Sequence, residues 1–167
     1  MILGMSLAAF TKLHVIISLI AIVSGIVVMF RLLGSRWTPG WTALFLFTTI
    51  LTSATGFLFP FTELLPSHVI AIVSLVLLAI ACVALYGMKL AGAWRWIYVV
   101  TAMVSLYLNI FVLIIQGFLE VPALHALAPS VPPAGPPFAV AQGVALLFFV
   151  LVIIGAVRRF RPPPTLA

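Results

Sequence analysis

The sequence predicts an all-α membrane protein, folded as a bundle of five transmembrane helices. Hydrophobic residues make up 65% of the 167 residues and charged residues only 6%, whereas a soluble domain carries about 25% charged residues. Five apolar segments reach the roughly 20 residues that a helix needs to cross a bilayer. All 12 prolines lie between these segments or at their ends. The mean hydropathy of +1.40 indicates lipid, rather than water, as the solvent.

The predicted spans cover about residues 7–33, 41–60, 67–88, 94–119 and 138–157. Short loops, one longer proline-rich loop at 120–137 and a short tail complete residues 1–167, so we expect a single transmembrane domain. A proline inside a helix removes a backbone hydrogen bond and clashes with the preceding turn. Because no span contains an internal proline, each should be a continuous helix. The first span is longer than the apolar core of a secretory signal and ends in arginine, so we expect it to be retained.

The basic residues predict the orientation of the bundle. Five crossings place the C-terminal ends of the first, third and fifth spans on one side of the membrane. Seven of the eight basic residues lie at or just beyond these ends: Arg31, Arg36, Lys89, Arg95, Arg158, Arg159 and Arg161. Basic loops favour the cytoplasm, which predicts an outside N-terminus and a cytoplasmic C-terminus. All four tryptophans (Trp37, Trp41, Trp94 and Trp96) fall at the same interface, as an aromatic belt would.

Polar residues of another kind gather at the predicted outer side. The chain has two acids, three histidines and three side-chain amides, and we take them as candidate site residues: His14, Glu63, His68, Asn109, Gln116, Glu120, His125 and Gln142. At 1.5 Å of rise per residue, the histidine of the first span and the amides of the fourth and fifth lie in the outer half of a core about 30 Å thick.

Several polar positions also repeat with helical spacing. The repeats are His14, Ser18, Ala21 and Gly25 in the first span, Thr48, Thr52 and Thr55 in the second, and Ser105, Asn109 and Gln116 in the fourth. Residues at these spacings share one helix face, and polar faces in lipid turn toward protein or water. Such faces are typical of close helix packing. The amides and the imidazole, which are costly to bury, favour the other interpretation, a polar pocket near the outer face.

The histidines could serve several kinds of site. His14 and His68 are candidate axial ligands for a b-type haem. A metal ion could use His14, His68 or His125 together with Glu63 or Glu120, although HxxxH and CxxC spacings are absent. The chain has no aspartate, so it can form no Ser–His–Asp triad. No catalytic residue is predicted, and the sequence favours a non-enzymatic protein without excluding an enzyme.

Several stretches resemble a group of small bacterial multi-pass membrane proteins to which no activity is assigned. They are LHVIISLIAIVSG (13–25), TSATGFLFPF (52–61), PSH (66–68), AWRWIYV (93–99) and YLNIFVLIIQGFLEVPALHALAP (107–129). The resemblance implies a bacterial inner membrane and a helical fold. It implies no reaction and no cofactor.

Three functions are compatible with these features. The first is a polytopic inner-membrane protein whose interhelical pocket near the outer face binds haem, a metal, a quinone or a lipid. The second is an accessory or structural subunit of a larger membrane complex. The third is a small transporter or channel, although five spans do not divide into the two equal repeats common in transporters. The expected partners are the bilayer and a membrane protein or second copy, and no basic, aromatic patch indicates nucleic acid.

Overall fold

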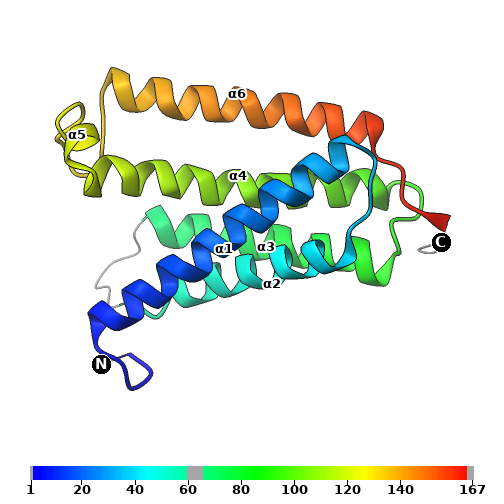
Figure 1. Ribbon diagram of the computed structural model, residues 1–167, viewed down its shortest axis with the longest axis horizontal. Helices are drawn as coiled ribbons and strands as arrows, with labels where there is room; N and C mark the ends of the chain where they lie inside the picture. The colour runs from blue at the N-terminus through cyan, green and yellow to red at the C-terminus, as the bar shows by residue number, and fades with distance from the viewer. Residues whose placement is uncertain (1, 60–65, 165–167) are drawn as a thin grey trace.

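The computed structural model describes residues 2–59 and 66–164, and all named elements in this part of the chain are helices (Figure 1). The helices are α1 (Leu7–Leu33), α2 (Pro39–Gly56), α3 (Pro66–Cys82), the π-helix η1 (Val83–Gly87), α4 (Trp94–Glu120), α5 (Pro122–His125) and α6 (Pro136–Arg159). The long helices run up and down, so that α1 begins and α6 ends at opposite ends of the bundle. The predicted all-α fold is confirmed.

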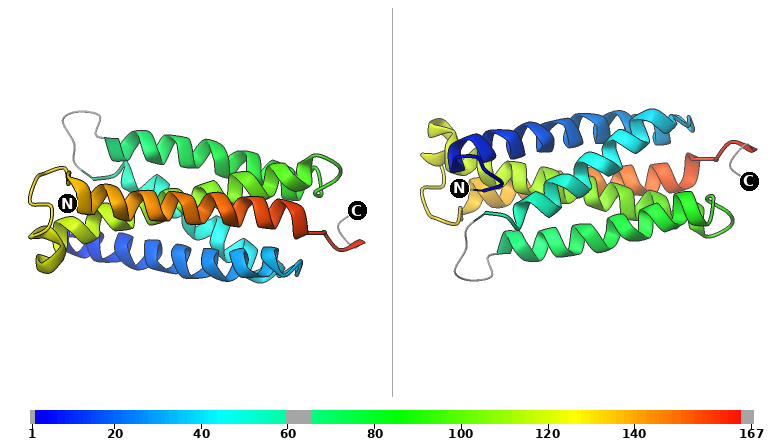
Figure 2. Two further views of the ribbon diagram at one scale, coloured as in Figure 1. Left: turned by 90° about the horizontal axis from the view of Figure 1, so that it is seen from above. Right: turned by 90° about the horizontal axis from the view of Figure 1, so that it is seen from below.

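Four of the long helices form a closed ring. Helix α1 packs against α2, α2 against α3, α3 against α4, and α4 against α1. Helix α6 lies outside this ring along α4 and α1, and the short α5 packs on the end of α4 (Figure 2). Because α4 contacts every other helix among the described residues, it is the central element of the bundle.

The prolines mark where helices begin. Pro39, Pro122 and Pro136 each occupy the first position of their helix, where the missing N–H would have no intrahelical partner. The expectation that no proline interrupts a span is confirmed for the described residues. Continuity is nevertheless broken at the end of the third span. The N–H of Met88 bonds to the carbonyl oxygen of Val83, five residues back, at 2.8 Å, which widens the helix into a π turn.

Four helical segments are long and apolar enough to cross a membrane: Leu7–Leu33, His68–Gly87, Trp94–Glu120 and Pro136–Arg159. The second predicted span forms the 18-residue helix α2, which ends at Gly56 rather than near Pro60 and is not among these four. It is rich in hydroxyl groups, which lower its hydropathy. Thr48, Thr49 and Thr52 each donate to a carbonyl oxygen one turn earlier in the same helix. The chain is therefore a multi-pass membrane protein with four candidate spans.

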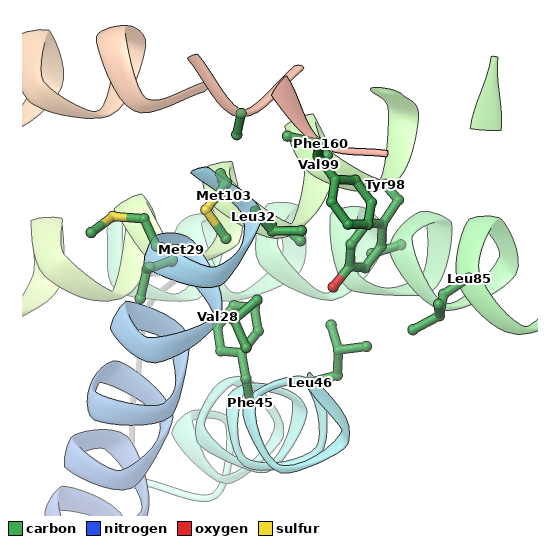
Figure 3. Packing of buried hydrophobic residues seen from close by; sticks show 14 of the residues in the cluster. Val28, Met29, Leu32, Phe45, Leu46, Leu85, Tyr98, Val99, Met103 and Phe160 are labelled. Atoms are coloured by element: carbon green, nitrogen blue, oxygen red, sulfur yellow. The ribbon is translucent and has the colours of Figure 1, made fainter. Parts of the chain in front are cut away.

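The tightly packed core fills one half of the bundle. It joins the last turns of α1, the first half of α2, the end of α3, the first half of α4 and the second half of α6, with Phe45, Tyr98 and Phe160 fully buried (Figure 3). We call this half the basic end, because the seven basic residues grouped above lie at its helix termini and connections. The Trp37 ring lies 6.4 Å from the rings of both Tyr98 and Phe160, and Trp41 and Trp96 are exposed.

Candidate functional site

The other half of the bundle contains a cavity. A cavity of about 770 Å³ lies among α1, α2, α3 and α4, and we call this half the cavity end. Apolar residues from all four helices line it together with ten polar ones: Thr11, His14, Ser18, Thr52, Ser53, His68, Ser74, Asn109, Gln116 and Glu120. Helix α2 touches α4 across the ring, whereas α1 and α3 make no described contact with each other. The cavity thus occupies the space that these two opposite helices leave open.

Five of the eight candidate site residues line this cavity. They come from three helices, with His14 on α1, His68 on α3, and Asn109, Gln116 and Glu120 on α4. The predicted polar faces also point inward nearer the core, since Gly25 and Thr48 are buried and Ser105 is fully buried. Residues far apart in the sequence therefore share one interhelical space.

The remaining three candidates have other positions. Glu63 lies outside the described residues. His125 lies in α5, where its Nδ1 is 3.2 Å from the carbonyl oxygen of Phe118. The Nε2 of Gln142 donates to the carbonyl oxygen of Phe111 at 3.1 Å and so links α6 to α4. Neither His125 nor Gln142 is among the described residues that line the cavity.

The His14 ring is held by a contact that the sequence did not predict. Its Nδ1 lies 2.8 Å from the Oγ1 of Thr55, on α2. The same hydroxyl lies 2.6 Å from the carbonyl oxygen of Leu51 in its own helix. The Phe59 ring stands edge-on to the imidazole with 5.2 Å between centroids. The sequence places Thr55 only on a polar face of its helix, and no sequence signal connects it with a histidine 41 residues away.

Three further polar features belong to the cavity wall. The Nδ2 of Asn109 is buried and has no hydrogen-bond partner within the described residues, an arrangement that is rare in native proteins. The hydroxyl of Ser53 donates to that of Ser74 at 3.2 Å, which joins α2 to α3. His68 is only 4% exposed, and its ring centroid lies 5.7 Å from that of Phe57. The wall thus combines satisfied hydroxyls with one amide whose buried donor has no partner among the described residues.

The histidines and acids of the cavity end decide which metal or haem sites the described residues could form. In residues 2–59 and 66–164, no group of three or more His, Cys, Asp or Glu side chains could hold a metal ion. Glu120, the acid that reaches the cavity, is exposed at the last residue of α4. His14 and His68 do share the cavity lining, so its residues include two of the ligand type that haem iron accepts.

Comparisons with known proteins do not add an activity. No family model, curated protein or solved structure matches the chain. The membrane assignment therefore rests on the four long apolar helices. Residence in a bacterial inner membrane, which the resemblance implied, stays a prediction.

Proposed function

We propose that this protein binds a small amphipathic ligand in the cavity among α1, α2, α3 and α4. The observation that carries the proposal is the convergence of His14, His68 and Asn109, from three helices, on one space. Burying such groups in a membrane is costly unless they gain partners. The volume of about 770 Å³ lies within the roughly 300–1,000 Å³ typical of small-molecule sites.

The close packing of the basic end supports the interpretation that the cavity is a binding site rather than a sign of loose packing throughout the bundle. At the basic end the same four helices bury Phe45, Leu78, Tyr98 and Leu106 completely. The ring helices thus enclose a continuous apolar core over one half of their length and a cavity over the other. A space confined to the polar half is what a built site needs.

We also propose that α2 crosses the membrane as a fifth span, with the N-terminus outside and the basic end in the cytoplasm. In support, α2 lies in the ring between α1 and α3, which belong to candidate spans. The grouping of arginine and lysine at one end favours that end for the cytoplasm. The cavity would then face the outer half of the bilayer.

Filling the cavity should remove the ligand. Gly56 lines the cavity, and a Cβ added there would meet nothing within 4 Å, so Gly56→Leu should occupy the space without a clash. The Gly143→Leu variant is the matched control, because Gly143 is equally open but lies on α6 outside the described lining. We expect mass spectrometry of gently purified protein to find a bound small molecule in the wild type and control and to lose it in Gly56→Leu. Equal content in all three would contradict the proposal.

A further inference from the structure

The proposed function does not specify the polar group of the ligand, and the contacts of His14 indicate which group it is. Resting on that function, we infer that the cavity selects ligands whose polar head donates a hydrogen bond, and that the Nε2 of His14 accepts it. One short hydrogen-bonded chain, from Leu51 through Thr55 to His14, determines which imidazole nitrogen carries the proton.

The chain begins at Thr55. A threonine hydroxyl carries a single proton. At 2.6 Å, the carbonyl oxygen of Leu51 is close enough to take that proton as a hydrogen bond, and a carbonyl can only accept. The contact between Thr55 Oγ1 and His14 Nδ1, at 2.8 Å, therefore needs its proton from the imidazole. The assignment that satisfies both contacts therefore places the imidazole proton on Nδ1 of His14.

A neutral imidazole carries one proton, so Nε2 is left with a lone pair. The ring lies two turns inside an apolar helix and against Phe59, a place where a charged ring would be costly. The residue lines the cavity. The wall thus presents a fixed acceptor, because Thr55 prevents the proton from moving to the other nitrogen without loss of a hydrogen bond.

The remaining wall defines the rest of the ligand. Val15, Leu19 and Val112 add apolar surface. An alcohol or phenol head carries the proton that Nε2 accepts, and an apolar tail matches these side chains. An ether or a ketone would instead place an acceptor against the acceptor Nε2.

The test uses two probes that differ by one proton donor. A long-chain 4-alkylphenol and its methyl ether should be titrated against the full-length protein in lipid nanodiscs, with Gly56→Leu nanodiscs to subtract partition into lipid. We expect the phenol to bind about tenfold more tightly, because a site built to accept a hydroxyl proton rejects the analogue without one. His14→Phe should abolish the difference between the two probes.

A second variant separates this role from mere packing. Thr55→Val preserves the side-chain shape but frees the imidazole proton to move to Nε2, which could then donate to the ether oxygen. The preference for the phenol should fall several-fold in Thr55→Val. Thr48→Val is the control, because Thr48 lies on the same helix and its described hydrogen bonds are to its own backbone. This control should keep the wild-type preference.

Each outcome has a definite meaning. Equal affinity for the two probes, in nanodiscs where Gly56→Leu weakens both, overturns the donor rule while the proposed cavity binding stands. Binding of neither probe above the Gly56→Leu background overturns the rule and counts against the proposed function as well. A haem absorption band in purified protein that His14→Phe removes would assign Nε2 to iron and also overturn the inference.

Discussion

Single side chains determine how closely the ring helices approach. Gly25 of α1 faces Phe45 of α2 and Leu106 of α4, both fully buried. A Cβ at this position would lie 2.5 Å from the Cδ1 of Leu106 and 2.9 Å from the Phe45 ring. Such separations are shorter than van der Waals contact, so a larger residue has to push two packed side chains aside. Gly25 is thus required for the junction between α1, α2 and α4.

The Gly25→Val variant should therefore lower the free energy of unfolding by about 1–3 kcal/mol, the usual cost of overpacking a core. The measurement is the midpoint of thermal unfolding in detergent. Gly143→Val provides the control, since a Cβ at Gly143 meets nothing within 4 Å. A midpoint for Gly25→Val equal to that of the control would show that the helices can separate here at no cost.

The Arg95 side chain joins two helices at the basic end. Its Nη1 donates to the carbonyl oxygens of Val157 and Phe160, at 2.7 and 2.8 Å. These carbonyls lie at the C-terminus of α6, where the last groups of a helix lack partners and a positive charge is favourable. One guanidinium nitrogen thus fastens the end of α6 to the start of α4.

Replacing Arg95 by lysine should weaken this connection although the charge is kept. The lysine ammonium is a compact, strongly hydrated charge on a shorter and more flexible stem than the planar guanidinium, and we expect a loss of about 1 kcal/mol of stability. Arg159→Lys is the matched control, because Arg159 is exposed and makes no described side-chain hydrogen bond. Hydrogen exchange of α6 in detergent should rise in the first variant alone. Equal exchange in both would show that α6 needs no such fastening.

At the scale of a residue, the sequence located candidates but not their partners. The convergence of His14, Asn109 and Gln116 was predictable because helical spacing puts polar groups on one face and lipid turns that face inward. The bond from His14 to Thr55 was not predictable. It depends on the rotation and height of α2 relative to α1, and many pairs of polar faces would satisfy the same pattern.

Among the elements, α2 differs most from its prediction. The long spans were predictable to within a few residues because proline and basic residues mark their ends, as at Trp94–Glu120. Helix α2 is shorter than predicted. It is also richer in hydroxyl groups than the other long helices, and these hydroxyls bond to its own backbone. The π turn of η1 was also unpredicted, since no residue type in that segment requires a wider turn.

Labelling can decide whether α2 crosses the membrane. The chain has one cysteine, Cys82, so Ser35→Cys and Ala91→Cys can be placed singly in a Cys82→Ala background. Five spans put both positions on the same side of the membrane, whereas a non-crossing α2 puts them on opposite sides. We expect a membrane-impermeant maleimide to label both from the cytoplasmic side only, in inside-out vesicles.

The complementary position is Val131, which is 78% exposed in the long connection before α6. Val131→Cys in the same background should react only in right-side-out vesicles. Labelling of Ser35→Cys and Ala91→Cys from different sides would refute the fifth span. Labelling of all three from sides opposite to those expected would leave the span count intact and reverse the proposed orientation.

Over the whole molecule, the two halves of the bundle have different structures. One half holds the packed core, and the other holds the cavity. In the sequence, basic residues group at one end of the predicted spans, and histidines, acids and amides group toward the other. This pattern predicted which end of the bundle would hold the candidate site residues. The size of the cavity could not be predicted, because it depends on how far α1 and α3 stand apart. That separation is set by helix crossing angles, which periodicity does not report.

The shortness of α2 has a consequence for the surrounding lipid. At 1.5 Å per residue, its 18 residues span about 27 Å, against about 40 Å for the 27 residues of α1. On the proposed five-span topology, α2 is a span shorter than the hydrocarbon layer, and such a span thins the bilayer beside it. Because α2 ends at the cavity end, we expect acyl chains to be compressed and head groups drawn inward along that face. The protein should therefore prefer thin membranes, and short-chain lipids should gather around α2.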